Sequence, residues 1–424
     1  MASAGPAVQG EADLLADLQT VLAVSRALGA ERDLDRLLAL IVASATDLVD
    51  AERTSLFIVD RERNELWTRV AEGSGEIRLP LGRGIAGTVA ADGAVINIPS
   101  AYDDQRFDPA NDRRTGFRTR SILCLPMVNH EDVVVGVIQT LNKRGSAAFG
   151  ERDEQVLAAL AAQAGVALEN AQLLQRDRER QRLLHDLELA RTIQLGLLPE
   201  RVPEVAGWRF AAWQRSCDAT GGDYHDFIAG PDGAVDAVVG DVSGHGIAAA
   251  MLMSTARAFL LALHQYELDP AALVGRLNTL LAADMADDAF MTMVLARFHS
   301  DGGIAYVSAG HDPPMVLRRT PAVWDALDST GLALGMLDET TYDLARIAPL
   351  ARGDLVVLLT DGIPEAHALP ARDLFGSDRL RAAIATAADG GVLAVRDAVV
   401  AAVDAWLGGQ PQHDDMSLIV AERC

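Results

Sequence analysis

Four acidic motifs carry the side chains of this sequence that are best suited to chemistry. Asp223 stands in GGDYHDF, Asp241 in VVGDVSGHG and Asp361 in LLTDGIPEA, and Asp414 and Asp415 stand in HDDMSLIV. Each motif lies beside glycine or at the end of a strand-like apolar run, where a carboxylate can point into a cleft. One such motif alone would indicate a plain turn. Together, and with no His and Cys pair at zinc spacing, the four predict a site for Mg²⁺ or Mn²⁺.

Long stretches of chain separate these acids, so only a folded domain can bring them together. Beyond residue 205 short apolar runs alternate with helical patterns, which is typical of an α+β domain. The expected strands are 236–242, 291–298, 304–310, 354–361 and 416–422, and the expected helices are 246–266, 270–286 and 390–407. We assign this second domain to residues 200–424.

The first half of the chain also has an α+β pattern, over residues 20–172, with 1–19 as an N-terminal segment that starts the first helix. Helical spacing at 11–28 and 32–48 precedes strand-like runs, and helical spacing returns from Glu151. This order predicts a mostly antiparallel sheet flanked by helices. The expected strands are 55–60, 66–71, 121–128 and 133–142.

Residues 173–199 are predicted to be a helical linker. The stretch 175–182, QRDRERQR, has no apolar residue, so a helix there has no face to bury. Apolar residues then recur every three or four positions, which favours a homodimer seam, although a helix docked on its own domain gives the same pattern. The seam residues are Leu184, Leu187, Ala190, Ile193 and Leu197.

Composition excludes several classes of function. The formal net charge is −23, which argues against a nucleic-acid binder and against binding to an anionic membrane surface. Three cysteines are too few for a disulfide framework, and the N-terminus does not have the pattern of a signal peptide. The longest charge-free apolar runs are too short to cross a bilayer. We expect a cytoplasmic protein.

The second domain resembles the SpoIIE/RsbU-type branch of the PPM metal-dependent protein serine/threonine phosphatases. The likeness rests on GGDYHDF, GDVSGHGIAAAM, SAGHDPP, LTDGIPEA, FGSDRL and DDMSLIV, and LELARTIQLGLLPE resembles the helix that precedes such domains. It implies an α/β/β/α sandwich with a two-metal site, Mn²⁺ or Mg²⁺, that activates water against a phosphoserine or phosphothreonine. The implied substrate is a small regulatory protein of the anti-anti-sigma-factor type.

The resemblance also implies roles for single residues. Asp241 matches the ligand that bridges both metals, and the Val242 carbonyl matches a backbone ligand. Further ligands correspond to Asp223, Asp361 and Asp414, whereas Asp415 is either an accessory ligand or a residue behind the ligands. His245 and His311 are either hydrogen-bond anchors or catalytic groups.

The first domain contains the segments LDRLLALIVASATDLVDAERTSLFIVD, GRGIAGTVAADGAVINIPSA and SILCLPMVNHEDVVVGVIQTLNK. Through these segments it resembles a GAF domain, a family of small-molecule sensors. A pattern shared with GAF domains that bind cyclic nucleotides is formed by Asn142, Lys143, Phe149, Asp153 and Glu154. Its physical content includes a Lys–Asp pair that pins the last strand to the following helix. The domain then binds a cyclic nucleotide, binds another small ligand or serves as a ligand-free dimerisation module. The charged loop 102–120 could cap a phosphate.

These patterns together predict a GAF-regulated signalling phosphatase. Two other readings remain open at the level of sequence. One is a non-catalytic regulator that uses the PPM fold to bind a partner, and the other is a ligand-gated dimerisation module.

Overall fold

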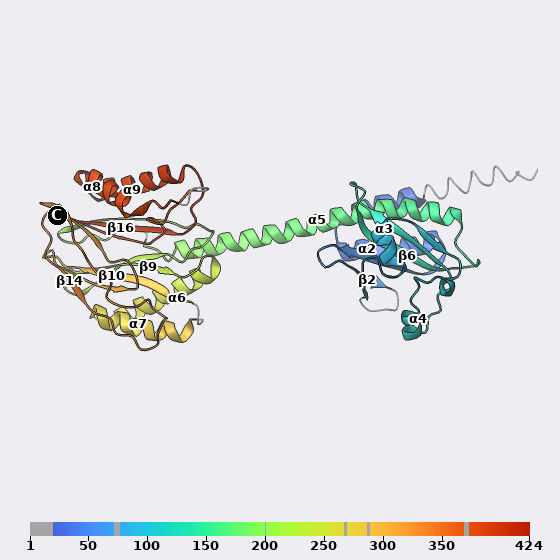
Figure 1. Ribbon diagram of the computed structural model, residues 1–424, viewed down its shortest axis with the longest axis horizontal. Coiled ribbons are helices and arrows are strands. Elements are labelled where there is room, and N and C mark those ends of the chain that lie inside the picture. The colour runs from blue at the N-terminus through green and yellow to red at the C-terminus, as the bar shows by residue number, and fades with distance from the viewer. Residues whose placement is uncertain (1–19, 72–76, 200, 267–268, 286–288, 369–372) are drawn as a thin grey trace, which may run out of the picture. The chain divides into compact units, whose positions relative to one another are not determined.

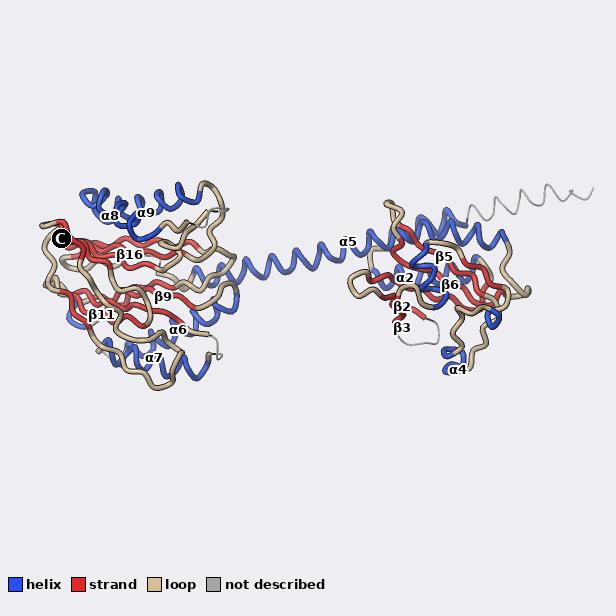
Figure 2. Tube along the Cα trace, in the orientation of Figure 1, coloured by secondary structure: helices blue, strands red, loops and turns tan. Residues whose placement is uncertain are grey.

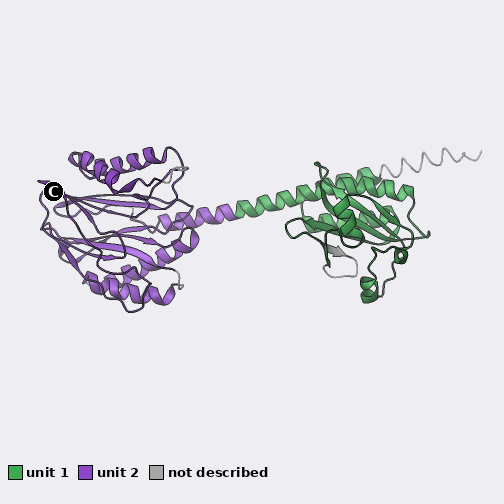
Figure 3. Ribbon diagram, in the orientation of Figure 1, with its two compact units in different colours: residues 1–182 green, residues 183–424 purple. Residues whose placement is uncertain are grey.

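The computed structural model describes residues 20–71, 77–199, 201–266, 269–285, 289–368 and 373–424 (Figure 1). The chain forms two compact units, residues 1–182 and 183–424 (Figure 3). The boundary falls inside the predicted helical linker. Each unit is described by itself below.

Unit 1 is built on a six-stranded antiparallel sheet in the order β3-β2-β1-β6-β5-β4. Its strands are β1 (Ala51–Asp60), β2 (Glu65–Ala71), β3 (Ile77–Pro80), β4 (Ile96–Ile98), β5 (Ile122–Val128) and β6 (Val134–Lys143). Four of these are the strands expected from sequence. The short β3 and β4 extend the two edges of the sheet.

Helices cover both faces of this sheet. On one face, α2 (Leu34–Leu48) and the first part of α5 (Glu151–Leu195) share a core with Leu56 and Ile138. A Cβ at Gly165 would lie 2.1 Å from the Val128 carbonyl oxygen, so α5 approaches β5 as closely as the backbone allows. On the other face, α3 (Gly84–Asp92) packs in a second, smaller core. The described part of unit 1 also contains a helix at Thr20–Ala30, the short helix α4 (Ala110–Thr115) and a 3-10 turn at Ala101–Asp103.

Unit 2 contains two five-stranded antiparallel sheets, β14-β11-β10-β9-β8 and β13-β12-β15-β16-β7. The first is formed by β8 (Tyr224–Ala229), β9 (Val235–Val242), β10 (Met291–Phe298), β11 (Ile304–Ala309) and β14 (Ala345–Ile347). The second is formed by β7 (Trp208–Arg215), β12 (Met315–Arg319), β13 (Ala322–Trp324), β15 (Leu355–Leu359) and β16 (Met416–Arg423).

The two sheets stack face to face, with one core between them and one on each outer face. Val239, Phe298 and Ile419 belong to the central core. The outer helices are α6 (Ile247–His264) and α7 (Pro270–Asp284) over the first sheet, and α8 (Gly376–Ala387) and α9 (Gly391–Leu407) over the second (Figures 1 and 2). This is the α/β/β/α sandwich that the resemblance implied, and the α+β prediction is confirmed for both units.

Among the described residues, two helices, α5 and α6, are long and apolar enough to span a membrane by length and composition alone. Core helices of folded domains pass the same test, and α6 buries Ala249, Met253, Ala256 and Leu260 in its own domain. The last part of α5 is different, because many of its apolar side chains are exposed. Leu184 is 54% exposed and Ile193 is 60% exposed, whereas Leu187, Ala190 and Leu197 are half-buried, so the predicted seam is open only in part.

Candidate functional site

The five acidic residues predicted from sequence stand at one end of the sandwich. Asp223 directly precedes β8 and Asp241 is the penultimate residue of β9, while Asp361 follows β15 and Asp414 and Asp415 directly precede β16. Tyr224 pairs with Gly240, and Leu359 pairs with Leu418, so each sheet brings its two motifs to the same edge. The antiparallel pairing thus gathers residues that are far apart in the sequence.

Asp223 is held between the two sheets. It is buried, and its Oδ2 accepts a hydrogen bond of 2.8 Å from the Thr360 hydroxyl. The same Thr360 oxygen accepts from the backbone N–H of Ser417 at 2.9 Å, which ties β16 into the contact. The other carboxylate oxygen of Asp223, Oδ1, is buried without a hydrogen-bond partner among the described residues.

The carboxylates raise one another's pKa values. Burial and the charge of Asp241 raise the pKa of Asp223 well above its usual range. Burial raises the pKa of Asp241 to about 7, with further contributions from the charges of Asp361, Asp414 and Asp415. Burial, followed by the charge of Asp414, also raises the pKa of Asp361. Mutual repulsion of this kind is what a bound cation relieves.

Asp415 differs from its neighbours because the backbone uses both of its oxygens. Its Oδ1 accepts from the Cys217 N–H at 2.7 Å and its Oδ2 from the Gly222 N–H at 2.7 Å. The side chain is 2% exposed. Asp415 therefore holds the loop that leads into Asp223, and we read it as a positioning residue.

Gly222 lets this loop approach the end of β9. A Cβ at Gly222 would lie 2.7 Å from the Val242 carbonyl oxygen and 3.2 Å from Asp241 Oδ1. No larger residue fits there without moving these groups. The predicted backbone ligand, the Val242 carbonyl, thus faces the same narrow space as the Asp241 carboxylate.

The donor set fits divalent cations of the hard type, which prefer oxygen ligands. Two observations support this fit: the buried Asp223 oxygen without a partner among the described residues, and the burial and neighbouring carboxylate charges that raise the pKa of Asp241. Within the described ranges, no group of three His, Cys, Asp or Glu side chains has the arrangement of a preformed metal site. The fit therefore rests on the chemistry of the donors.

The two histidines whose roles the sequence left open, His245 and His311, are hydrogen-bonded. His311 is buried, and its ring joins the Thr292 hydroxyl of β10 at 2.8 Å to the Leu359 carbonyl of β15 at 3.0 Å, which links the two sheets beside the site. Burial lowers the pKa of His311. His245 is exposed and its Nδ1 lies 2.7 Å from Asp218 Oδ2. His311 thus acts as an anchor, and His245 joins two loops at the rim.

Sequence reasoning missed two residues that support the site, Thr360 and Gln194. Gln194 lies in the last turn of α5 and is buried, although most residues around it are exposed. Its amide donates to the Gly221 carbonyl at 2.6 Å and accepts from the Gly221 N–H at 3.1 Å. The helix end is therefore fastened to the loop that leads into Asp223. The sequence signal that could have indicated this contact was Gln194 itself, a polar residue among the apolar residues of the seam.

The five residues of the predicted cyclic-nucleotide pattern lie where β6 meets α5. Lys143 Nζ contacts Asp153 Oδ1 at 3.0 Å and donates to the Val49 carbonyl at 2.9 Å, so the predicted Lys–Asp pair is present. Glu154 accepts from the Asn97 amide at 2.6 Å, and Phe149 is buried in the core. Asn142 accepts from the Arg120 N–H at 2.6 Å, which fixes the end of the loop 102–120.

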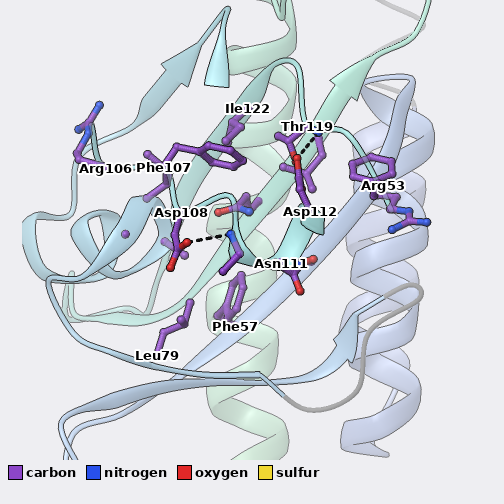
Figure 4. A pocket seen from close by; sticks show the side chains of 18 of the residues that line it. Arg53, Phe57, Leu79, Arg106, Phe107, Asp108, Asn111, Asp112, Thr119 and Ile122 are labelled. Atoms are coloured by element: carbon purple, nitrogen blue, oxygen red, sulfur yellow. Dashed lines mark hydrogen bonds between the residues drawn. The ribbon is translucent and has the colours of Figure 1, made fainter. Parts of the chain in front are cut away.

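A separate cavity of about 480 Å³ opens on the other face of the unit 1 sheet. This volume is within the usual range for small-molecule sites. None of the five pattern residues lines it. Its walls come from β1, β5 and β6, from the start of α3, and from the loop 102–120, as Figure 4 shows. The lining includes Arg53, Ser55, Phe57, Ile85, Arg106, Phe107, Asp112, Arg114, Phe117 and Gln139.

Comparisons with known proteins agree with this division. The family model "Stage II sporulation protein E (SpoIIE)" matches residues 231–424, and the GAF domain model matches residues 33–168. The chain is thus similar to the GAF family in its first half and to the SpoIIE family in its second half. The predicted resemblances are confirmed at the level of the family for both halves.

A solved structure and two curated relatives extend these matches. The SiaA-PP2C domain of Pseudomonas aeruginosa is 24% identical, covers 58% of this chain and 98% of its own, and has a TM-score of 0.51, which shows the shared fold. The "Dual 3',5'-cyclic-AMP and -GMP phosphodiesterase 11A" of Takifugu rubripes is 40% identical over 147 residues, 31% of this chain. The "Probable 3',5'-cyclic phosphodiesterase pde-5" of Caenorhabditis elegans is 36% identical over 154 residues, 33% of this chain. The chain spans 16% and 21% of the length of these two relatives.

Proposed function

We propose that the SpoIIE-type domain hydrolyses phosphoserine or phosphothreonine on a regulatory protein and depends on Mn²⁺ or Mg²⁺. The observation that carries the proposal is the set of mutually repelling carboxylates at one end of the two sheets, with a buried Asp223 oxygen that has no partner among the described residues. The family match supports the same reaction. The substrate we propose, by the family likeness, is of the anti-anti-sigma-factor type.

Asp223, Asp241, Asp361, Asp414 and the Val242 carbonyl would hold two divalent cations. Such ions, when bound, stabilise the charge of a phosphoryl group and lower the pKa of water. The chain's own contribution is to fix these donors. Thr360 orients Asp223, Asp415 holds the backbone on the N-terminal side of Asp223, and Gly222 leaves room beside Asp241. Donors fixed in advance need little reorganisation during the reaction.

We test this by hydrolysis of para-nitrophenyl phosphate and of matched phosphopeptides by the full chain. Activity is expected with Mn²⁺ or Mg²⁺, and a chelator is expected to abolish it, because carboxylates alone cannot neutralise the phosphoryl charge. A phosphoserine peptide should be cleaved faster than its phosphotyrosine counterpart. Absence of hydrolysis with either metal would favour a non-catalytic, partner-binding role, and preference for phosphotyrosine would contradict the substrate class.

We further propose that the GAF domain binds a cyclic nucleotide in the 480 Å³ cavity and regulates the phosphatase. The cavity combines three aromatic side chains with guanidinium groups, which suits an anionic ligand with a planar ring. The similarity to cyclic-nucleotide phosphodiesterases supports this choice.

A ligand that binds only the folded state raises the melting temperature of its domain. We therefore expect cAMP or cGMP, at up to millimolar concentration, to raise the GAF melting transition of the full chain, measured by scanning calorimetry. The unphosphorylated ribose sugar alone serves as control. No shift with either nucleotide would contradict this part of the proposal.

We also propose that the chain acts as a homodimer through the exposed apolar residues at the end of α5. Leu184, Leu189 and Ile193 are each more than half exposed, and Leu189 and Ile193, four residues apart, share one face of the helix. A second copy of the same helix offers a matching apolar stripe.

A further inference from the structure

The guanidinium groups of the GAF cavity differ in how they are engaged. Arg106 forms a two-point contact with Asp104, at 2.9 and 2.7 Å, and Arg114 donates to Asn111 at 2.8 Å. The Arg53 guanidinium lines the same cavity but forms no hydrogen bond or ion pair with any residue in the described ranges. In the view of Figure 4, Arg53 and Arg106 stand on opposite sides of Phe107 and Phe57.

An aromatic ring holds Arg53 in place. Its guanidinium carbon lies 4.1 Å from the centroid of the Phe117 ring, which comes from the loop 102–120. Stacking of this kind orients the guanidinium plane while its N–H groups stay available for hydrogen bonds. The Arg53 side chain is half-buried, so its guanidinium is partly desolvated. It has no ion-pair partner within the described chain and can therefore bind an anionic ligand.

Two uncharged polar side chains, Ser55 and Gln139, line the cavity beside Arg53. Arg53, Ser55 and Phe57 alternate along β1, so their side chains share one face of the sheet. Ser55 pairs directly with Gln139 of β6. Among the described residues, the Cys124 thiol approaches the Gln139 amide at 3.9 Å, and the Ser55 hydroxyl has no hydrogen-bond partner. The Ser55–Gln139 pair therefore offers a donor and an acceptor next to an aromatic wall.

We propose that Arg53 binds the anionic group of the ligand in this cavity, and that Ser55 and Gln139 read the hydrogen-bonding edge of its planar ring. The assignment moves ligand recognition from the five-residue pattern at the junction of β6 and α5 to the floor formed by β1 and β6. It rests on the cyclic-nucleotide part of the proposed function. Because Arg53 contacts the anionic group and Ser55 and Gln139 contact the ring, substitutions at these two places should change ligand affinity in different ways.

Isothermal titration of the full chain with cGMP, cAMP, guanosine and adenosine tests this assignment. Arg53→Met keeps the length of the side chain and removes its charge. It is expected to weaken binding of the cyclic nucleotides by about 10- to 100-fold, the range for loss of a charge-assisted hydrogen bond. Binding of the uncharged nucleosides should change little. Gln139→Leu should instead weaken nucleotides and nucleosides alike.

Arg63→Met is the matched control, because Arg63 is an exposed arginine at the β1–β2 turn outside the cavity. It should leave all affinities unchanged. Equal cyclic-nucleotide affinity of Arg53→Met and the unaltered chain would overturn the role of Arg53 and leave cyclic-nucleotide binding intact. Failure of the unaltered chain to bind either cyclic nucleotide would overturn that part of the proposed function and, with it, this assignment.

Discussion

Replacement of Asp241 by asparagine is expected to lower metal-dependent phosphate-ester hydrolysis by more than about 100-fold. Asp241 stands between the other acids, since the charges of Asp361, Asp414 and Asp415 all act on it and it neighbours Asp223. Asparagine keeps the shape but supplies no negative charge to hold a cation. The measurement is the steady-state rate with para-nitrophenyl phosphate at saturating Mn²⁺.

The same substitution is expected to stabilise the metal-free phosphatase domain at pH 8. Folding raises the pKa of Asp241 from 3.8 to about 7. A carboxyl group of this kind favours the folded state below its unfolded pKa and loses that contribution as the pH rises toward 7. Asp241→Asn should therefore melt above the unaltered chain at pH 8 in chelator, and the difference should shrink at pH 5.

Asp284→Asn provides the control, because Asp284 is an exposed carboxylate at the end of α7. Its rate and melting temperature should match those of the unaltered chain. If Asp241→Asn has a lower rate but a higher melting temperature, the loss of activity comes from loss of a metal ligand and not from unfolding. Near-normal hydrolysis by Asp241→Asn would remove Asp241 from the ligand set.

Local sequence patterns were enough to predict the central strands and the longer helices of both domains, whereas β7, β8, β12 and the helix α8 were not among the expected elements. Within the runs 236–242 and 354–361, residues 237–240 (AVVG) and 355–359 (LVVLL) contain no charged or polar side chain because each strand is buried on both faces. Short edge strands such as β13 and β14 carry three residues each, too few for a periodic signal. The helix α3 was hidden in a glycine-rich stretch, GRGIAGTVA, which reads as a loop.

The acidic site could be predicted because carboxylates beside glycine at strand ends are visible in the sequence. Its supports could not, since contacts such as Thr360 with Asp223 and Gln194 with Gly221 exist only between distant segments. The residues of the GAF cavity could not be predicted from the sequence for the same reason. The residues that line it alternate along strands, and nothing in the local sequence distinguishes Arg53, which is unpaired within the described chain, from Arg106, which is paired.

The adjacent acids Asp414 and Asp415 could not be distinguished by sequence, and the structure predicts opposite effects when each is changed. Partial desolvation at the site, together with the charge of Asp415, raises the pKa of Asp414, so removal of its charge relieves repulsion. Its Oδ1 accepts from the Asp415 N–H, and asparagine can still do so. We expect Asp414→Asn to melt at or above the unaltered chain in chelator.

Asp415→Asn is expected to melt lower, by roughly 2–12 °C, since a buried group left without its hydrogen bond costs about 1–3 kcal/mol. Both oxygens of Asp415 accept backbone N–H groups, from Cys217 and Gly222, and the asparagine amide nitrogen can accept from neither. Thermal melts of both variants in chelator give the comparison. If Asp415→Asn instead melted above the unaltered chain, as Asp414→Asn should, the charge of Asp415 would be repulsive like that of a metal ligand. Its role in holding the loop before Asp223 would then be wrong.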